Sequence, residues 1–533
     1  MMLYLKEKFE KNKFWLIFSL ASTYLWGLAA HAYCFFDNNI SHDSLAEFCG
    51  HLTDFNGILG NGLKYATGRF LTPIYKELFR TDIAPPWLAG LLGLLWVGLT
   101  VFLVLRIFRI ESKSLAFLVA GVMVTNITVS ALAATFFHDF DNEMFSLLLA
   151  TAAVYFWKCH SRGVLLGAVL LAASMGLYQC FLFTAITFIM MVCIFALLDG
   201  ERFQKVIVMG LRAIAMILLG GLLYYVLMKA ALYLSHASLL TGTVNSLGNA
   251  LKLTPKTFWD FSVAAYQNWY GYLWYAHSPY SGLLVKKITW ILAGIIAVAL
   301  TWGLANKRVH IWEKLLCLVL IFLLPYGMNL IYVLTQGAMH EVMVYSIWMS
   351  YLFALLLGNW LASEWKCINF CKQYIAKAGT GINILCMMLV FVLLYGNVQF
   401  SNGMYLKKDI EYDAYLSLMS RVVDRMEEEV AYVPGETQVV FVGLPEDLND
   451  QIPGFEMHSL ATGMWSTDIL FEYTRQRFQA YFDYVLCAPI KLLEDSQWNA
   501  MLENQEVLGM PNYPAKGCIK MVDDVLVVKL GDF

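Results

Sequence analysis

The chain has little charge: only 14% of its 533 residues are Asp, Glu, Lys or Arg, while 59% are hydrophobic. Soluble globular proteins have about 25% charged and about 45–50% apolar residues, so this composition excludes an ordinary soluble protein. The formal net charge is −3, which leaves no basic stripe for nucleic acid. No phosphate loop of the form G-x-x-x-x-G-K-[ST] occurs, which excludes a nucleotide-driven pump of that type. The composition indicates a membrane protein.

The hydrophobic residues form runs that are long enough to cross a bilayer. A hydrocarbon core of about 30 Å needs about 20 apolar helical residues, and we predict eleven spans. They are residues 14–36, 87–107, 115–137, 144–157, 164–178, 180–198, 213–235, 288–305, 315–335, 342–361 and 380–398. The first run exceeds the roughly 7–15 apolar residues of a signal peptide, so we expect it to be a span.

The positive residues decide whether the stretch 164–198 is one long span or two short ones. With two spans, the Lys/Arg clusters at 6–13, 106–113, 158–162, 202–212, 307–314 and 366–377 all fall on one side, which the positive-inside rule identifies as cytoplasmic. A cytoplasmic N-terminus follows. Loops 37–86 and 236–287, the turns at 138–143 and 336–341, and everything after about residue 400 are then expected on the outer side.

Charged residues are sparse up to about residue 400 and dense after it, which predicts a transmembrane domain at 1–399 and an extracytoplasmic α/β domain at 400–533. In the second domain, residues 409–430 place Leu416, Met419, Val423, Met426 and Val430 on one helical face. Residues 439–442 and 484–486 are typical of short buried strands, and 518–522 with 525–528 of a hairpin that turns at Asp523-Asp524. We find no nucleophile elbow, zinc spacing or dinucleotide fingerprint there.

Loop 37–86 carries two candidates for chemistry. Asp43 follows the first span by about seven residues, at the outer lipid boundary; alternatively it is the N-cap of a helix. Arg69 lies in Gly68-Arg69, where lipid phosphates are expected, and a guanidinium can bind a phosphate through two hydrogen bonds. The alternative for Arg69 is snorkelling toward lipid headgroups.

The turn at 138–143 has the sequence His138-Asp139-Phe140-Asp141-Asn142-Glu143. Three carboxylates in five residues repel one another, so their pKa values rise unless a cation or a hydrogen-bond donor compensates. Asp139 or Asp141 could instead cap the next helix. A Ca²⁺ or Mg²⁺ site is a further alternative, but two or three oxygens in one turn are a weak indication of one.

Further polar residues lie at the edges of the predicted spans. Tyr178-Gln179 ends the shortest span, and His340-Glu341 forms part of a small outer turn. Polar groups at the membrane edge are costly, which favours a function, although each pair could simply cap a helix. Cysteines show no framework spacing, and Cys34 with Cys49 or Cys487 with Cys518 are the pairs that could form disulfides.

Several of these pieces, taken in order, resemble the GtrII-type membrane glucosyltransferase family, within the wider GT-C class of lipid-sugar-dependent glycosyltransferases. Four stretches carry the resemblance: Asn38-Asn39-Ile40-Ser41-His42-Asp43, Thr67-Gly68-Arg69-Phe70, Phe137-His138-Asp139-Phe140-Asp141 leading into Phe145-Ser146-Leu147-Leu148-Leu149, and Ser174-Met175-Gly176-Leu177-Tyr178-Gln179. The tail, Met510-Pro511-Asn512-Tyr513-Pro514 followed by Gly517 and Val527-Val528-Lys529-Leu530, resembles that of Gram-positive members. The family usually has two adjacent acidic residues after the first span, where this chain has His42-Asp43.

The resemblance implies a GT-C-like membrane fold that takes glucose from a polyprenyl-phosphate donor and passes it, with inversion, to a surface polysaccharide or teichoic-acid-type acceptor. Asp43 matches the catalytic acidic position of the first outer loop, and a carboxylate there could accept the acceptor hydroxyl proton. The expected catalytic residues are Asp43, Asp139 and Asp141, and the expected substrate-binding residues are His42, Arg69, His138, Tyr178, Gln179, His340 and Glu341. No cofactor is expected, and a divalent metal is the less favoured alternative because a single phosphate ester can leave with help from Arg69 alone.

Two other classes of function fit parts of the pattern. A transporter or flippase of lipid-linked sugars usually has polar contacts near the membrane midplane, whereas Lys229 is the clearest charged residue inside a predicted span. No internal repeat of the membrane half is visible. A polysaccharide polymerase or ligase would share the outer-face chemistry and is left open by the topology.

Overall fold

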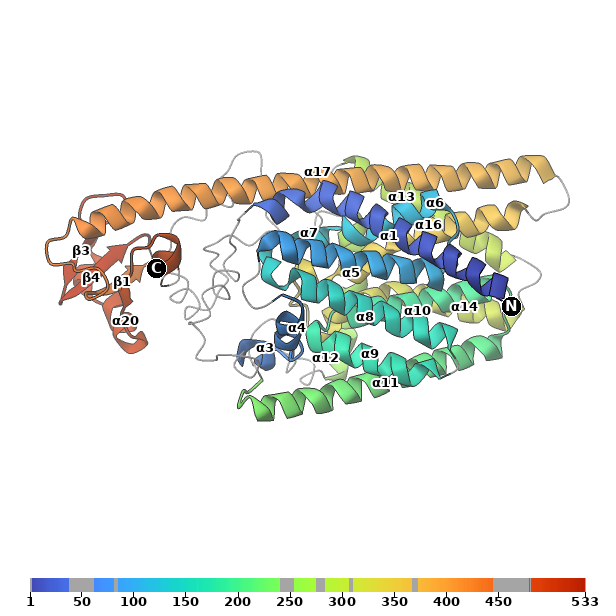
Figure 1. The fold of residues 1–533 in the computed structure, drawn as a ribbon, viewed down its shortest axis with the longest axis horizontal. Helices are drawn as coiled ribbons and strands as arrows, with labels where there is room; N and C mark the ends of the chain where they lie inside the picture. Colours follow the sequence, from blue (N-terminus) through green and yellow to red (C-terminus); the bar gives the residue numbers. More distant parts are fainter. Residues whose placement is uncertain are drawn as a thin grey trace. The chain divides into compact units, whose positions relative to one another are not determined.

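The computed structural model describes residues 2–37, 62–80, 85–160, 162–239, 254–274, 283–305, 310–366, 372–443, 479 and 481–532. The chain divides into two compact units (Figure 1). The first comprises Met1–Phe36, Gly57–Ala133 and Asp139–Asn402, and the second comprises Asp37–Asn56, Ala134–His138 and Gly403–Phe533.

The first unit is helical. Its elements are α1 (Met2–Phe36), α3 (Gly62–Ala66), α4 (Thr72–Phe79), α5 (Pro86–Ile107), α6 (Lys113–Val124), α7 (Ile127–Thr135), the 3-10 turn η1 (Phe137–Asp139), α8 (Phe140–Cys159), α9 (Gly163–Leu177), α10 (Phe181–Leu198), α11 (Phe203–Leu234), α12 (Pro255–Trp274), α13 (Leu283–Ala305), α14 (Ile311–Met328), α15 (Leu330–Leu334), the 3-10 turn η3 (Glu341–Met343), α16 (Tyr345–Lys366) and the first part of α17 (Lys372–Glu427). The end of α7 and the first two residues of η1, within Ala134–His138, belong to the second unit.

Eight helices within the described residues are long and apolar enough to cross a membrane, and the bent pair α6–α7 makes a ninth if it is one span. The eight are α1, α5, α10, α11, α13, α14, α16 and α17. Eleven spans were expected. The expected spans 144–157 and 164–178 fall on α8, which is outside this set, and on α9, which has only 15 residues.

The expected span 115–137 bends by 40° between α6 and α7. Asn126 lies at the break, and its side chain forms hydrogen bonds with the backbone of both helices. Its Nδ2 donates to the carbonyl of Val122 at 3.0 Å, and its Oδ1 accepts from the amide of Val129 at 3.2 Å. A short polar side chain that bonds to the backbone in this way competes with the helical hydrogen bonds, which explains the interruption.

Neighbouring helices approach closely where one of them has glycine. Helices α1, α5, α8, α9 and α11 pack in series (Figure 1). In α5, a Cβ on Gly90 would lie 2.4 Å from the ring of Phe35, and one on Gly93 would lie 2.3 Å from the ring of Phe140. Small residues at such contacts are typical of membrane helices, whose association depends on close van der Waals packing.

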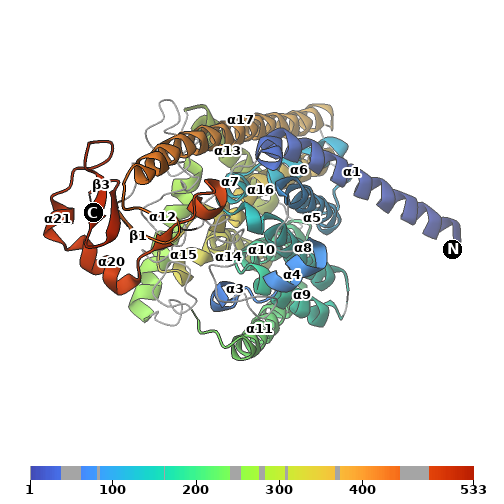
Figure 2. The ribbon, with the colours of Figure 1, turned by 60° about the vertical axis from the view of Figure 1, so that its left-hand side comes forward.

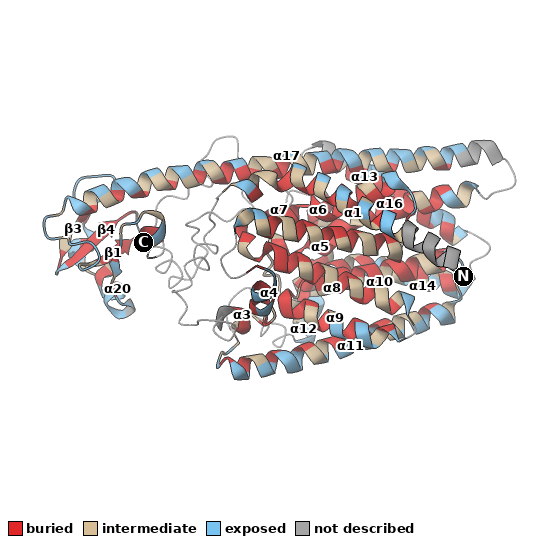
Figure 3. Ribbon diagram, in the orientation of Figure 1, coloured by how far each residue is buried: buried red, intermediate tan, exposed pale blue. Residues whose placement is uncertain are grey.

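Burial separates the inner helices from the outer ones (Figure 3). In the most apolar windows of α10 and α16, 72% of residues are buried, whereas the corresponding share in α11 is 22%. Helices α10 and α16 are therefore surrounded by protein, and α11 presents most of its apolar surface outward, as a lipid-facing helix does.

The second unit contains a four-stranded sheet in the order β2-β1-β4-β3. Its elements are β1 (Gln438–Val442), the π-helical turn η5 (Tyr481–Val485), β2 (Lys491–Leu492), α20 (Asp495–Leu502), α21 (Gln505–Leu508), β3 (Ile519–Val522) and β4 (Val525–Lys529). β1 pairs in parallel with β2 and β4, while β3 and β4 form an antiparallel hairpin. The strand expected at 439–442 and the hairpin around Asp523-Asp524 are confirmed.

Two expectations for the second unit are wrong. Residues 484–486 do not form a strand, because the chain coils as η5 and Asp483 accepts hydrogen bonds from Gln479 Nε2 at 2.6 Å and the amide of Ile490 at 3.3 Å. The helix expected at 409–430 ends at Glu427 as the last part of α17, so Val430 lies beyond it and is fully exposed. The buried positions of its inner face are Tyr415, Met419, Val422 and Met426.

Candidate functional site

Three of the four stretches singled out in the sequence meet in the first unit. The stretch 67–70 links α3 to α4, 137–141 crosses from η1 into α8, and 174–179 ends α9. Figure 2 shows α3 and α4 beside the larger helices α8, α9 and α11. The fourth stretch, with His42 and Asp43, lies outside the described residues.

Hydrogen bonds fix the loop that carries Arg69. The amide of Leu71 donates to the carbonyl of Gly176 at 2.9 Å, and Gln179 Nε2 donates to the carbonyl of Thr67 at 2.9 Å. Tyr224 Oη, from α11, donates to the carbonyl of Gly68 at 3.3 Å. Gly68 has φ 76°, a backbone conformation that glycine adopts without the strain a Cβ would cause. Helices α9 and α11, together with Gln179 just after α9, thus hold the position of Arg69.

The compensating cations that the acidic turn needs come from α3, α4 and the loop between them. Lys64 Nζ lies 2.5 Å from Asp139 Oδ2, and Lys76 Nζ lies 3.6 Å from Asp139 Oδ1. Arg80 Nε donates to Asp141 Oδ2 at 2.8 Å, with both side chains at most 2% exposed. Asp139 is at the N-cap position of α8, but its side chain makes no cap hydrogen bond. These contacts favour ion pairing over capping as the role of the turn.

Arg69 is more exposed than the other three cations. Its Nη1 lies 3.6 Å from Asp139 Oδ2 and 3.5 Å from Glu143 Oε1, and its guanidinium stacks on the Tyr178 ring at 4.7 Å. Its side chain is 19% exposed, against 9% or less for Lys64, Lys76 and Arg80. Arg69 is therefore the cation of this cluster that an arriving anion reaches most easily.

Glu143 completes the cluster from the first turn of α8, ahead of the apolar run that begins at Met144. Its Oε2 is buried and has no hydrogen-bond partner in the described part of the chain. Burial raises the pKa of Glu143 to about 8, although the charge of Arg69 acts in the opposite direction. Glu143 can therefore hold a proton near neutral pH and donate it in a hydrogen bond.

The turn with His340 and Glu341 is linked to the site through Tyr178. Tyr178 Oη donates to the carbonyl of Val342 at 3.1 Å, and Thr128 Oγ1 donates to the carbonyl of Glu341 at 2.8 Å. His340 Nδ1 accepts from the amide of Val342 at 3.3 Å, as an N-cap of η3. His138 lies in η1, next to Asp139 in the chain. Tyr178 thus contacts both the turn at 340–342, through its hydroxyl, and Arg69, through its ring.

The sequence analysis assigned no role to Lys64, Lys76 and Arg80, and it gave neither Glu143 nor Tyr224 an individual one. The sequence did contain an indication of these cations. Loop 37–86 is expected on the outer side, where Lys and Arg are normally scarce, yet it has four basic residues after position 60. An excess of positive charge there matches the excess of negative charge at 138–143.

Among the described residues, no group of three or more His, Cys, Asp or Glu side chains is arranged to hold a metal ion. The carboxylates of Asp139 and Asp141 are instead ion-paired with Lys and Arg. Cys487 and Cys518 are both free thiols, so the disulfide considered between them is absent. Cys49, the other candidate partner of Cys34, lies outside the described residues.

The fold and the site define a helical membrane protein with a buried, ion-paired polar cluster at the ends of its helices. Residues 32–357, more than half of the chain, match the family model described as glucosyl transferase GtrII. The chain therefore belongs to the GtrII glucosyltransferase family, and it is a glycosyltransferase. The match includes all four site stretches. No curated protein matches the chain.

Proposed function

We propose that the protein transfers a sugar, glucose by its family, from a polyprenyl-phosphate donor to a cell-surface polysaccharide or teichoic-acid-type acceptor. The observation that carries this proposal is Arg69, a partly exposed guanidinium on a loop whose backbone is hydrogen-bonded to α9, to Gln179 just after it, and to α11. A polyprenyl-phosphate sugar leaves a single phosphate ester, and a fixed guanidinium stabilises the charge that develops on it.

We assign the general base to Asp43, in an inverting reaction. The carboxylate would accept the acceptor hydroxyl proton on the side of the anomeric carbon opposite the departing phosphate. Support comes from the end of α1, from which the loop with Asp43 starts. There the Phe35 ring packs 5.7 Å from that of Phe140, the residue after Asp139. The end of α1 thus lies beside Phe140, which adjoins Asp139 in the chain.

The roles of Asp139 and Asp141 follow from their partners. Asp139 pairs with Lys64 and Asp141 with Arg80. We therefore assign both carboxylates to positioning Arg69 and its loop, whereas the sequence suggested a catalytic role for them. Glu143, whose Oε2 is unpaired in the described structure, is the better candidate for a hydrogen bond to a sugar hydroxyl. Tyr178 and Gln179 border the same place, and His42, His138, His340 and Glu341 stay as proposed substrate contacts.

We propose further that the enzyme is a multi-pass protein of the cell membrane with a cytoplasmic N-terminus and an extracytoplasmic α/β domain at 400–533, so that transfer takes place at the outer face. The excess of Lys and Arg on one side of the predicted spans supports this orientation. Protease digestion of intact cells that carry a tag at either end tests it. Cleavage of the C-terminal tag alone is the expected result.

The decisive experiment offers radiolabelled polyprenyl-phosphate glucose and a cell-wall acceptor to the purified full-length protein in nanodiscs. Wild type is compared with Asp43→Asn and with Asp532→Asn, a control at a residue whose side chain is 83% exposed. We expect transfer to be lost in Asp43→Asn alone, with melting temperatures unchanged. The anomeric configuration of the product, read by NMR, should be opposite to that of the donor.

The rival functions give different results in the same experiment. Undiminished transfer by Asp43→Asn would remove Asp43 as the base and make Glu143 the next residue to test. If wild type transfers no sugar from any lipid-linked donor but moves one of them between leaflets, the proposal fails in favour of transport. A product that grows by repeated units would instead indicate a polymerase.

A further inference from the structure

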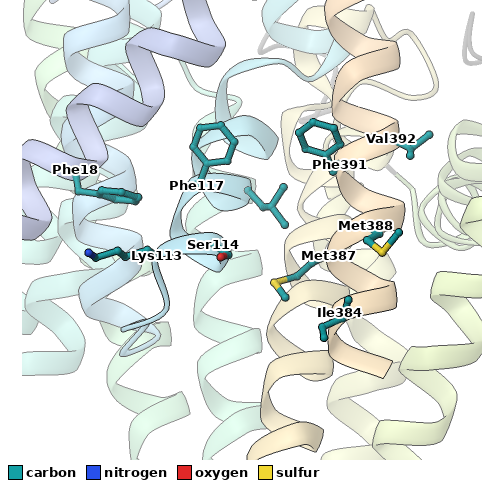
Figure 4. Close-up of a pocket in the computed structure, with 10 residues that line it drawn as sticks. Phe18, Lys113, Ser114, Phe117, Ile384, Met387, Met388, Phe391 and Val392 are labelled. Atoms are coloured by element: carbon teal, nitrogen blue, oxygen red, sulfur yellow. The ribbon is translucent and has the colours of Figure 1, made fainter. Parts of the chain in front are cut away.

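A groove of about 570 Å³ runs along the first unit between α1, α6 and α17, away from the cluster around Arg69. Its walls are almost entirely apolar. Figure 4 shows Phe18 from α1, Phe117 from α6, and Ile384, Met388 and Phe391 from α17 around it. Among the described residues that line it, Lys113 is the one that carries a charge.

The groove is closed at one end, where α6 and α17 come together. A Cβ on Gly121 of α6 would lie 2.4 Å from Leu394 Cδ1 of α17. Beside this contact, the Trp26 ring lies 5.2 Å from that of Phe117 and 5.8 Å from that of Phe391. An apolar chain that enters from the side of Lys113 therefore meets a wall of aromatic rings.

The length of the groove fits one leaflet of a bilayer. Its lining on α17 extends from Ile384 to Val392, which at 1.5 Å per residue is about 12 Å. One leaflet contributes about half of a hydrocarbon core of about 30 Å. The groove thus has room for part of one acyl chain whose headgroup stays at the open end.

Lys113 supplies the recognition at that open end. It is the first residue of α6, its side chain is exposed, and its Nζ lies 5.2 Å from the centre of the Phe14 ring. No carboxylate in the described part of the chain forms an ion pair with it. The positive end of the α6 dipole adds to its charge.

We propose that this groove binds one anionic phospholipid, with an acyl chain between α1, α6 and α17 and the phosphate diester on Lys113. This site is separate from the one proposed for the donor. Lys113 is the first residue of α6, and Thr135 is the last residue of α7, just before η1 and Asp139. About 22 residues therefore separate Lys113 from the turn with Asp139, which is about 33 Å measured along the two helices. The donor phosphate cannot contact both ends.

The test titrates the delipidated full-length protein with dioleoylphosphatidylglycerol or dioleoylphosphatidylcholine and counts bound lipids by native mass spectrometry. We expect one phosphatidylglycerol to bind more tightly than phosphatidylcholine. Lys113→Gln should weaken phosphatidylglycerol about fivefold, because a basic residue near an anionic headgroup contributes about 1 kcal/mol, and leave phosphatidylcholine unchanged. The control is Lys205→Gln on α11, an exposed lysine paired with Glu201 outside the groove.

A second variant tests the groove itself. Met388→Trp replaces a flexible side chain of the lining by a large ring. The Met388 side chain is 60% exposed, so the protein should still fold. It should weaken both lipids. Equal binding of the two lipids by wild type, equal effects of Lys113→Gln and Lys205→Gln, or preferential displacement of phosphatidylglycerol by polyprenyl phosphate would each overturn the proposal.

Discussion

Arg69 stacks on Tyr178 and lies 3.5–3.6 Å from two carboxylates, so a shorter side chain with the same charge tests its geometry. Arg69→Lys keeps the charge but loses the planar, two-point contact with a phosphate. We expect sugar transfer to fall by about 10²–10³, the usual cost of removing one donor that stabilises a developing anion. Initial rates of the purified variant with the polyprenyl-phosphate donor measure it.

The matched control for Arg69→Lys is Arg421→Lys. Arg421 is exposed on α17 and donates only to the carbonyl of Ser417, at 3.1 Å, within its own helix. Its substitution should leave the rate unchanged. A rate in Arg69→Lys within twofold of wild type would show that the phosphate does not bind this guanidinium.

The ion pair between Arg80 and Asp141 has almost no access to solvent. Arg80→Met leaves a buried carboxylate without its closest cation, which costs about 3–5 kcal/mol, whereas replacing both partners by apolar residues is often close to neutral. We therefore expect Arg80→Met to lower the melting temperature strongly and the double variant Arg80→Met/Asp141→Leu to recover most of the loss. Thermal unfolding in detergent of both singles and the double measures the coupling, and additive losses would contradict it.

Glu143 should make the stability of the protein depend on pH. Burial raises its pKa to about 8, so the folded protein keeps a proton that the unfolded chain releases above about pH 4. Its contribution is complete below that value and is lost as the pH rises through about 8. The melting temperature of wild type should fall over this range more than that of Glu143→Gln. Parallel curves for the two proteins would rule out a raised pKa at Glu143.

The sequence identified Arg69, Asp139, Asp141, Tyr178 and Gln179 because each stands in a short polar stretch beside a long apolar run. Their contacts could not be predicted from it. Asp139 and Lys64 are 75 positions apart, and they meet only through the way α3 packs in the first unit, where it contacts α11. No local pattern specifies which of several basic residues in a loop faces which of three carboxylates.

At the scale of helices, the contact between α5 and α8 depends on the absence of a side chain at Gly93. Gly93→Ala would place a Cβ 2.3 Å from Phe140 Cε1, so the ring and the adjoining Asp139 and Asp141 must shift. Overpacking of this kind costs about 1–3 kcal/mol. We expect a lower melting temperature and reduced transfer, measured side by side.

Gly210 is the control for this substitution, because nothing lies within 4 Å of a Cβ built there, on α11. Gly210→Ala should leave both quantities unchanged or slightly raise the melting temperature, since alanine favours helix. A melting temperature of Gly93→Ala equal to that of Gly210→Ala would show that α5 and α8 separate without cost.

Hydrophobic runs predicted the positions of the helices well, because about 20 apolar residues in a row leave few alternatives. They could not predict where a helix continues past its apolar part. α17 does not stop after the apolar run 380–398 but extends through Gly403 to Glu427, since the polar stretch after residue 400 also favours helix. At 484–486, residues with strand propensity coil instead, because Asp483 binds the backbone locally.

For the molecule as a whole, the charge that stabilises the departing phosphate should come from the protein alone. In the described part of the acidic turn, Asp139 is paired with Lys64 and Lys76, and Asp141 with Arg80. We therefore expect EDTA to leave the rate of transfer unchanged. A rate that EDTA abolishes and Mg²⁺ or Mn²⁺ restores would contradict this assignment of charge, whereas slow inactivation that no metal reverses would point to a general effect on the preparation.

The family to which the chain belongs was accessible from residues alone, since four motifs occur in a fixed order. The number of spans was not. α8 and α9 are helical where spans were expected, but their length and hydropathy do not identify them as spans. Length and hydropathy are a weak guide for an inner helix, because a helix surrounded by protein needs neither the length nor the apolarity of one in lipid.

The 15 residues of α9 give it a length of about 22 Å, about 8 Å less than the hydrocarbon core of an average bilayer. If α9 crosses the bilayer, as the sequence predicts, Tyr178 and Gln179 at its end lie below the plane of the lipid headgroups. In the reaction proposed above, a polymer acceptor then reaches down to these residues, and the donor phosphate rises less far than to the membrane surface. We therefore expect bilayers built from longer acyl chains to slow transfer without altering any residue of the site, because membrane thickness then limits the access of both substrates.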